Sequence, residues 1–442
     1  MTVTVVGGGL AGIEAAHQLA LRNIDVVLYE MRPNKMTPAH KTGKLSELVC
    51  SNSLKAIRRE SAAGLLKEEM RILESLTLSA ADLARVPAGG ALAVDRDVFS
   101  DIITERIENN PRIKVIREEI TEIPEGNVII ASGPLTSDKL SEEIRKFFGE
   151  EHLSFFDAAA PIVSADSIDY EKVFRAARYG RGDDDYINCP FTKEEYDRFY
   201  DELISAESVE LEGFEKEAFK VYEGCMPVEV MARRGRDTLR FGPLKPVGLY
   251  DPKTDKRPWA VVQLRSEDKD FKGFNLVGFQ TNLKFPEQER VFRMIPGLQS
   301  AVFTRYGVMH RNTFLNSPKV LDGFQRAKGR ENLFFAGQMT GVEGYMESAM
   351  SGIVAGINMA RVLEGKKLIS FPETTMIGAL LGHQRNDFTK DFEPMGANMG
   401  ILPRVENSGK KLPKAERYAV VAEKAYETMK KFIKENKQGE RL

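Results

Sequence analysis

Two of the three cysteines in this 442-residue chain stand in surroundings where a thiol could act as a nucleophile. Cys50 is followed by Ser51, Asn52 and Ser53, residue types that favour turns and helix caps over a core. Cys225 stands between a glycine and a Met-Pro pair, and several arginines follow it. The thiolate is the reactive form of cysteine, and nearby cations favour it. The alternative for both residues is a small buried side chain without a chemical role.

Basic residues gather in three short stretches that could bind phosphate groups. They are residues 32–44, the arginines after Cys225, and Arg326–Arg330. Each stretch alone is more typical of a solvated face, but all three around one cleft would follow a nucleic-acid backbone. The net charge of −2, from 63 Lys and Arg against 65 Asp and Glu, neither requires nor excludes such a partner. The candidate substrate-binding arginines are Arg233, Arg234 and Arg236.

The elements that must position these residues begin at the N-terminus. Val3–Val6 predicts a strand, Gly7, Gly9 and Gly12 match the spacing G-x-G-x-x-G, and a segment with helical periodicity follows. A second predicted strand ends in Glu30. Glycines in this order permit a tight turn, close approach of a pyrophosphate and close helix packing, while the acid can accept hydrogen bonds from ribose hydroxyls. The pattern predicts a dinucleotide-binding fold rather than an ordinary glycine-rich turn.

A second strand–glycine–helix unit, Glu331–Ala360, favours FAD over NAD as the dinucleotide. Val128–Pro134 is typical of the intermediate strand in the same class of flavoproteins. No second G-x-G-x-x-G has a strand before it, so a nicotinamide would bind only transiently. The predicted cofactor-binding residues are Gly7, Gly8, Gly9, Leu10, Ala11, Gly12, Glu30, Arg32, Gly337, Gln338, Gly344 and Tyr345.

The composition excludes several classes of protein. Hydrophobic residues make up 42% and charged residues 29% of the chain, which is typical of a soluble globular protein of two or three domains. Three cysteines without a C-x-x-C pair or a Cys/His cluster argue against a disulfide framework and against a metal site. The N-terminus lacks the pattern of a signal peptide, and no apolar run could span a membrane. We therefore expect a cytoplasmic protein with no membrane partner.

The predicted fold class is α/β, with a Rossmann-like FAD-binding domain interrupted by an inserted α+β domain. We assign residues 1–160 and 310–442 to the FAD-binding domain. Residues 161–309 alternate charged helical segments with strand-like ones, and we assign them to the insertion. An apolar stripe within residues 413–436 predicts a helix that packs on the core.

Several stretches together resemble one known family. They are "VVGGGLAGIEAA" with "YEMRP", "ELVCSNSL", "YEGCMPVEVMARRGRDTLRFGPLKPVGL", "VGFQTNLKFPEQ" and "AGQMTGVEGYMESAMSGIVAG". Over nearly its whole length the chain is similar to the folate- and FAD-dependent tRNA (uracil-5-)-methyltransferases. GidA-type tRNA-modifying flavoproteins share this scaffold but carry a large helical C-terminal extension that is missing here.

The resemblance implies methylation at C5 of the T-loop uridine (uridine 54) of tRNA. It implies a methylene group from 5,10-methylenetetrahydrofolate, transfer by way of reduced FAD, and NAD(P)H as the reductant. A thiolate that adds to C6 of uracil makes C5 nucleophilic, a task that suits cysteine. The resemblance implies a functional role for both Cys225 and Cys50 without deciding which one attacks C6. We favour Cys225 as the nucleophile and Cys50 as a guard of the flavin, and on the resemblance we expect Gln280 and Asn282 to face the folate.

Some residues carry weaker expectations. Tyr345 could stack on the flavin, although an aromatic residue here is as often part of the core. Glu343 could accept the C5 proton, although a solvated loop acid is the more common case. Cys189 has apolar neighbours and is expected to pack in a core. The alternative functions are a small-molecule FAD oxidoreductase, a GidA-like modifier of the tRNA wobble uridine, and a non-catalytic FAD-binding module.

Overall fold

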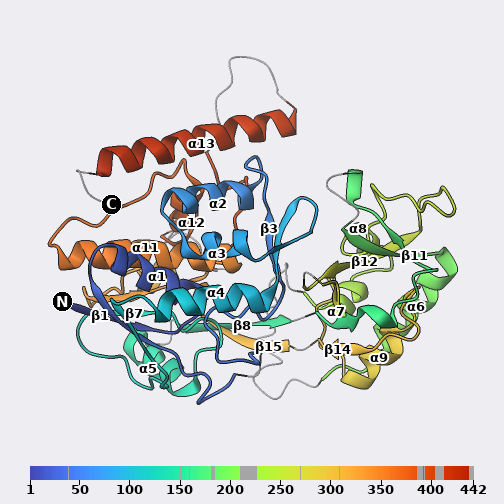
Figure 1. The fold of residues 1–442 in the computed structure, drawn as a ribbon, viewed down its shortest axis with the longest axis horizontal. Coiled ribbons are helices and arrows are strands. Elements are labelled where there is room, and N and C mark those ends of the chain that lie inside the picture. The colour runs from blue at the N-terminus through green and yellow to red at the C-terminus, as the bar shows by residue number, and fades with distance from the viewer. Residues whose placement is uncertain are drawn as a thin grey trace.

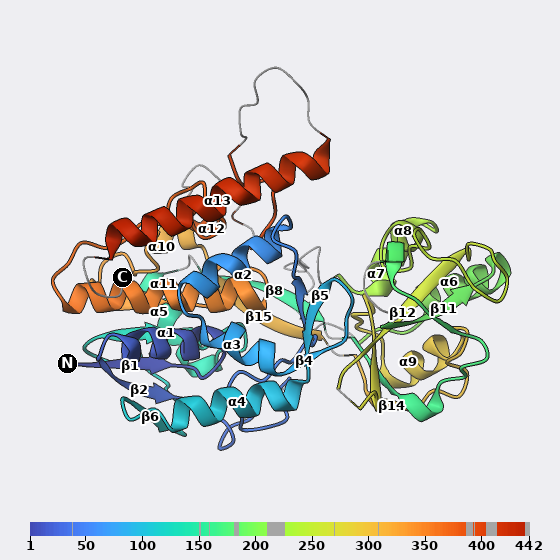
Figure 2. The same cartoon turned by 45° about the horizontal axis from the view of Figure 1, so that its top comes forward.

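A computed structural model shows two lobes joined near the middle of the molecule (Figure 1). The first lobe holds both termini and is crossed by the long C-terminal helix (Figures 1 and 2). The structure describes residues 1–37, 39–149, 152–158, 160–180, 185–209, 226–268, 270–307, 309–385, 392, 394–403 and 413–437.

The first lobe is built on a parallel sheet of five strands in the order β16-β7-β1-β2-β6. The strands are β1 (Thr2–Val6), β2 (Asp25–Tyr29), β6 (Ile113–Ile116), β7 (Val128–Ile130) and β16 (Leu333–Phe335). Their interior is an almost continuous apolar run, as expected for a parallel sheet covered on both faces. In this sheet β7 pairs with β1 on one side and, on the other, with β16, which lies about two hundred residues later in the chain.

Two helices pack against each other over this sheet, α1 (Leu10–Leu21) and α11 (Tyr345–Leu363). Their close approach depends on glycine, because a Cβ atom on Gly352 would lie 2.1 Å from the backbone oxygen of Ala11. A Cβ atom on Gly356 would lie 2.8 Å from the oxygen of Ala15. The small residues of α11 therefore set the distance between the two helices that follow the glycine turns.

Further elements cover the first lobe. The helices are α2 (Ala62–Ile72), α3 (Leu76–Leu83), α4 (Arg96–Glu108), α5 (Asp138–Phe148), α10 (Ser317–Val320), α12 (Met376–Gln384) and α13 (Lys414–Asn436). A small antiparallel sheet contains β3 (Ser53–Ala56), β5 (Ala91–Val94) and β4 (Arg85–Val86). The predicted C-terminal helix is present, and its residues Ala422, Ala425, Met429 and Ile433 are buried. Helix α13 packs on α2 (Figure 2).

The second lobe holds an antiparallel sheet of six strands in the order β10-β11-β12-β13-β9-β14. The strands are β9 (Ile162–Ser164), β10 (Phe174–Arg175), β11 (Tyr186–Phe191), β12 (Ala260–Ser266), β13 (Gly273–Leu276) and β14 (Phe303–Arg305). The helices are α6 (Lys193–Ser205), α7 (Val228–Arg233), α8 (Thr238–Phe241) and α9 (Phe285–Phe292). Short 3-10 turns lie at Ala165–Ser167 and Arg178–Gly180 in this lobe. A further one, Gln338–Thr340, lies between β16 and α11 in the first lobe.

An antiparallel pair of strands lies where the two lobes meet, β8 (His152–Ala158) and β15 (Met309–Leu315) (Figure 1). The predicted fold class, a Rossmann-like domain combined with an α+β unit, is confirmed. The predicted domain boundaries fall after residue 160 and after residue 309, beside this strand pair, and they stay a prediction.

Candidate active site

A groove opens where β1, β2 and β7 end and where helices α1 and α11 begin. Ligands of open parallel sheets bind at this edge. Ten predicted cofactor-binding residues line it, namely Gly7, Gly8, Gly9, Leu10, Ala11, Glu30, Arg32, Gly337, Gln338 and Tyr345. The two others lie beside the groove and shape it, because Gly12 packs against the turn and Gly344 begins α11.

The glycines at the start of α1 leave room for a phosphate group. Gly7 has φ +106°, and a Cβ atom on Gly12 would lie 1.8 Å from the oxygen of Gly7. A Cβ atom on Gly9 would meet nothing within 4 Å, so the space in front of this N-cap residue is open. No side chain caps this helix terminus among the described residues. An open, uncapped helix N-terminus is a favourable site for the pyrophosphate of FAD, and the residues present therefore fit this cofactor.

Glu30 and Arg32 form a buried ion pair at the end of β2. One Glu30 oxygen accepts hydrogen bonds from the Arg32 backbone N–H and from its Nε, both at 3.0 Å. The other accepts from the Gly8 N–H at 3.0 Å and from Arg32 Nη2 at 3.2 Å. Burial raises the pKa of Glu30, but the hydrogen bonds and charge of Arg32 outweigh this effect and hold the pKa below its usual value. Each oxygen of the Glu30 carboxylate already accepts two hydrogen bonds, so a ribose hydroxyl must replace one of these four donors.

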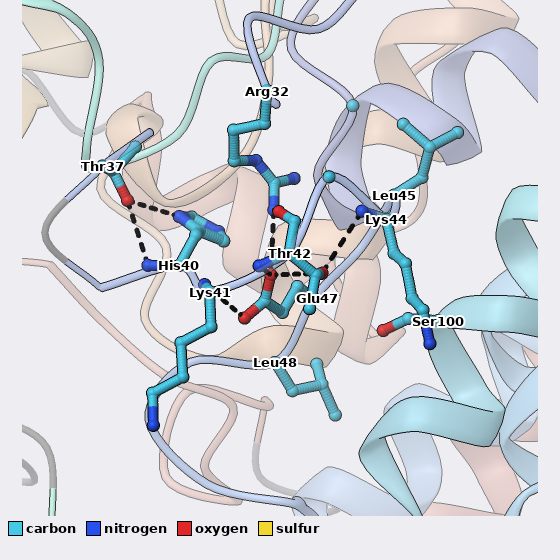
Figure 3. A network of polar contacts seen from close by, with 12 residues as sticks. Arg32, Thr37, His40, Lys41, Thr42, Lys44, Leu45, Glu47, Leu48 and Ser100 are labelled. Atoms are coloured by element: carbon cyan, nitrogen blue, oxygen red, sulfur yellow. Dashed lines mark hydrogen bonds and ion pairs between the residues drawn. The ribbon is translucent and has the colours of Figure 1, made fainter. Parts of the chain in front are cut away.

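Arg32 extends this network to the following loop (Figure 3). Its Nη1 group donates to the carbonyl of Thr42 and to the carboxylate of Glu47, both at 3.1 Å. Glu47 also accepts from the backbone N–H groups of Lys41 and Thr42, at 2.9 and 3.0 Å. Arg32 is only 2% exposed. Arg32 therefore holds the loop that leads to Cys50. Its burial argues against the interpretation of this residue as a cation that binds RNA phosphates.

The Cys50 corner lies beside the first residue of α11. The hydroxyl of Tyr345 accepts hydrogen bonds from the backbone N–H of Cys50 at 2.8 Å and of Ser51 at 3.2 Å. Val49 and Tyr345 both line the groove. Burial raises the pKa of Tyr345, and the nearby Cys50 thiol adds to this shift. Cys50, whose side chain is half-buried, therefore lies beside the part of the groove that Val49 and Tyr345 line.

Two arginines, which sequence reasoning missed, surround the same corner. Arg96 donates to the carbonyl of Leu48 at 3.0 Å, and Arg305 donates to the carbonyl of Val49. Burial lowers the pKa of Arg305, and the neighbouring charge of Arg96 lowers it further. The two residues come from α4 and from the end of β14, far from Cys50 in sequence. No local motif marks them, since only the fold brings them together.

The second lobe holds the same corner through strand β12. Arg265 donates from Nε to the side-chain oxygen of Asn52 and from Nη2 to Ser51 Oγ, both at 2.8 Å. Asn52 in turn donates to the carbonyls of Val94 and Ser266, at 3.1 and 2.8 Å. Asn52 is fully buried and Arg265 is 6% exposed. The polar run after Cys50 is therefore a contact between the two lobes and not a solvated turn.

Two buried acidic side chains, Glu343 and Glu347, accept hydrogen bonds at the start of α11. Glu347 is 1% exposed and accepts from Lys55 Nζ at 2.8 Å. Glu343 accepts from Gln338 Nε2 at 3.1 and 3.0 Å and is 5% exposed. The expectation of a solvated loop acid at Glu343 is wrong, because this carboxylate is buried and bonded to Gln338.

The predicted substrate residues lie on the second lobe. Gln280 is half-buried, and its carbonyl accepts from the Val228 N–H at 2.7 Å. Asn282 donates to the carbonyl of Val209 at 3.1 Å. Arg233 and Arg234 are exposed, and Arg236 pairs with Asp197 at 2.9 Å and with Asp201. Their contacts with a substrate stay a prediction.

Two of the three cysteines lie among the described residues. Cys225, the predicted nucleophile, lies outside the described residues. Cys189 is fully buried in β11, where burial raises the pKa of its thiol, as expected of a packing residue. Of the two described cysteines, Cys50 is the one beside the groove.

Several cations of the predicted basic stretches form ion pairs or hydrogen bonds within the protein. Lys35 pairs with Glu119 at 2.7 Å, and Lys44 pairs with Asp101 at 2.8 Å. Further along the chain, Arg326 pairs with Asp322, while Lys328 and Arg330 donate to backbone carbonyls. These cations stabilise loops, so the predicted phosphate track receives little support from them.

The described residues contain neither a metal-binding cluster nor a membrane-spanning helix. No group of three or more His, Cys, Asp or Glu side chains there could hold a metal ion. Within the same residues, no helix has both the length and the apolar character needed to cross a membrane.

Comparison with known proteins gives one consistent family. The family described as "Glucose inhibited division protein A" (GidA) matches residues 2–367. A protein of Anoxybacillus flavithermus named "Methylenetetrahydrofolate--tRNA-(uracil-5-)-methyltransferase TrmFO" is 58% identical over 98% of this chain and 100% of its own length. A protein of the same name from Exiguobacterium sp. is 56% identical over 97% of this chain and 98% of its own length.

A solved structure shares the fold at low sequence identity. GidA of Aquifex aeolicus superposes with a TM-score of 0.67 at 18% identity, covering 98% of this chain and 75% of that one. The groove, the glycine turns and the full-length identity agree with each other. The chain therefore belongs to the GidA family and to the methylenetetrahydrofolate--tRNA-(uracil-5-)-methyltransferases.

Proposed function

We propose that this protein methylates C5 of a tRNA uracil with the methylene group of 5,10-methylenetetrahydrofolate, and that FAD is its bound cofactor. The observation that carries the proposal is the Cys50 corner, which Tyr345 holds at the end of a dinucleotide groove. A thiol at this place suits chemistry in which a one-carbon unit passes beside a flavin. The relatives that bear this activity in their names match the chain over nearly its whole length.

The groove residues would hold FAD in a defined direction. The open N-terminus of α1 at Gly9 would bind the pyrophosphate, and Glu30 with Arg32 would lie toward the adenosine ribose. Gly337, Gln338 and Tyr345 would then lie toward the flavin. When bound and reduced by NAD(P)H, FAD would carry the one-carbon unit from folate to uracil and pass on the two electrons received from NAD(P)H.

The chain's own residues then have distinct tasks. We propose that the Cys225 thiolate forms a bond to C6 of uracil, which makes C5 nucleophilic and places negative charge on the C4 oxygen. After C5 gains the one-carbon unit and loses its proton, the bond to sulfur breaks and the thiolate is restored. Arg305 presents positive charge at the Cys50 corner, where such an enolate oxygen would be stabilised, while the neighbouring Arg96 pairs with Glu267 at 2.7 Å.

The finer features of the reaction are also proposals. We propose that NAD(P)H supplies the two electrons that convert a methylene into a methyl group. We propose that the target uracil lies in the T-loop of tRNA, and that residues 161–309 form an inserted domain that faces folate and RNA. Cys50, held beside the groove, would shield the one-carbon unit from water.

The test is a complete reaction with an identified product. Purified protein that holds FAD is mixed with an unmodified tRNA transcript, methylenetetrahydrofolate, and NADH or NADPH, and 5-methyluridine is measured by nucleoside mass spectrometry. We expect one 5-methyluridine per tRNA, in the T-loop. If no 5-methyluridine forms under any reductant while FAD stays bound, the proposed function is wrong and a small-molecule oxidoreductase becomes the better explanation.

The role of the nucleophile has its own matched control. We expect Cys225→Ala to abolish methylation while FAD binding is unchanged. Cys189→Ala changes a fully buried cysteine in β11 and should keep most of the activity. Full activity in the Cys225 variant would remove this residue from the mechanism.

A further inference from the structure

A second groove lies on the second lobe, at the end of β12 remote from the Cys50 corner. It is an open groove of about 850 Å³ between helix α8, the start of α6 and the loop before β12. Figure 1 shows α8 beside β11 and β12. Its lining contains five cations and one carboxylate, namely Lys193, Arg240, Lys245, Lys256, Arg257 and Asp251.

Aromatic side chains stand among these cations. Phe241 is 81% exposed, an unusual position for a phenyl ring, and Trp259 lies in the same lining. The guanidinium of Arg240 lies 3.7 Å from the centre of the Trp259 ring, and its Nε donates to the Trp259 carbonyl at 3.0 Å. Trp259 and Arg240 are therefore held rigidly, and Phe241 stands beside them in solvent.

Most of the cations in this groove have no acidic partner. Arg240 pairs with Asp237 at 2.6 Å. Within the described part of the chain, Lys193, Lys245, Lys256 and Arg257 form no ion pair. This distinguishes the groove from the basic stretches of the first lobe, where acids or carbonyls hold the cations. Positive charge that no carboxylate neutralises, next to an exposed aromatic ring, matches the chemistry of an RNA strand, whose phosphates are anionic and whose bases stack.

We infer that this groove binds the RNA substrate at a second place, with phosphates on its cations and an unpaired base on Phe241. The inference rests on the proposed function. Strand β12 connects the two places directly, because Arg265 near one end holds Asn52 and Trp259 precedes the other end. Six residue steps of a strand measure about 20 Å. One folded RNA can span this distance while a uracil lies at the Cys50 corner.

The test measures binding and catalysis separately on the FAD-bound protein. Fluorescence anisotropy with a labelled, unmodified tRNA transcript gives Kd at several salt concentrations. We expect Phe241→Ala to weaken binding about tenfold, because it removes one stacked base. The double variant Lys245→Gln, Lys256→Gln should reduce the slope of log K against log salt by about two, one for each phosphate contact. The rate at saturating tRNA should stay within about twofold of wild type.

Matched controls lie on helix α5 of the first lobe. Phe147 is 39% exposed, and Lys139 and Lys146 are exposed cations of the same helix, of which Lys146 pairs with Glu143. Phe147→Ala and the double variant Lys139→Gln, Lys146→Gln therefore change the same residue types away from the groove. Both should bind tRNA as wild type does. If Phe241→Ala binds tRNA as tightly as Phe147→Ala, the inference is overturned. It is also overturned if an oligoglutamate peptide displaces the tRNA as well as an oligonucleotide does, since the groove then prefers acidic peptides.

The two proposals fail in different ways. If wild-type protein forms 5-methyluridine but the groove variants bind normally, the proposed function stands and the second RNA site does not. If wild-type protein binds tRNA through the groove but forms no 5-methyluridine, the RNA site stands and the proposed reaction does not.

Discussion

The hydroxyl of Tyr345 accepts a hydrogen bond from the backbone N–H of Cys50 at 2.8 Å, across 295 residues of sequence. This bond joins the first residue of α11 to the loop after β2. It places a thiol at the groove without requiring any contact from the thiol itself. This phenolic oxygen therefore holds the Cys50 backbone directly, while Arg96, Arg305 and Arg265 hold its neighbours.

Replacing that oxygen tests its role in positioning. We expect Tyr345→Phe to lower the methylation rate about tenfold or more, because two backbone N–H groups lose their acceptor and the corner shifts. The loss of such a buried hydrogen bond costs about 1–3 kcal/mol. The measurement compares the rate at saturating substrates with the FAD content from absorbance. An unchanged rate at full FAD content would show that the corner is held by other contacts.

The contact between the lobes gives a second prediction. Arg265→Met removes both hydrogen bonds to the Cys50 loop and leaves the buried Asn52 oxygen without this donor. We expect a loss of about 1–3 kcal/mol in the free energy of unfolding, and a lower methylation rate. Arg175→Met, at an exposed position of the same sheet, is the control and should change neither quantity by much. Equal effects of the two substitutions would contradict a special role for Arg265.

Helix packing provides a third prediction. Gly352→Ala would place a Cβ atom 2.1 Å from the oxygen of Ala11, so the two backbones must separate. We expect a cost of about 1–3 kcal/mol in stability and weaker FAD binding. Gly382→Ala, in α12, meets nothing within 4 Å and should instead stabilise the protein by about 0.5–1 kcal/mol. Chemical denaturation of both variants checks the opposite signs.

Glu69 gives a prediction about pH. Burial raises its pKa from 4.5 to about 8, although its carboxylate accepts the N–H groups of Met376 and Ile377 at 2.8 and 2.9 Å. Because the pKa of Glu69 is higher in the folded protein than in the unfolded chain, the unfolded chain releases this proton at a lower pH than the folded protein does. Stability should therefore fall between about pH 4.5 and about pH 8 because of this group.

The substitution Glu69→Gln removes this proton exchange. We expect the variant to lose less stability than wild type between pH 5 and pH 8, whatever its absolute stability. Glu68→Gln, on a partly exposed face of the same helix, should keep the wild-type pH dependence. Denaturant midpoints at the two pH values give the comparison. Identical pH dependence in wild type and Glu69→Gln would show that Glu69 does not titrate in this range.

The sequence by itself determined the parts of this protein that depend on local order. The strand, glycine turn, helix and acid from Val3 to Glu30 follow each other within one supersecondary unit, so their residue types and spacing were sufficient to predict it. The same holds for the unit around Gly337 and for the C-terminal helix. The family prediction is confirmed by relatives at 54–58% identity, because long motifs in a fixed order are specific.

Only the tertiary structure decided which distant residues meet. Arg96, Arg305 and Arg265 carry no local signal, and they reach the Cys50 corner because two lobes pack there. Charge patterns were also poor guides to exposure. Arg32 looks like an RNA-binding cation in the sequence, yet it is buried against Glu30, because a burial cost can be offset by a partner that only the folded chain supplies.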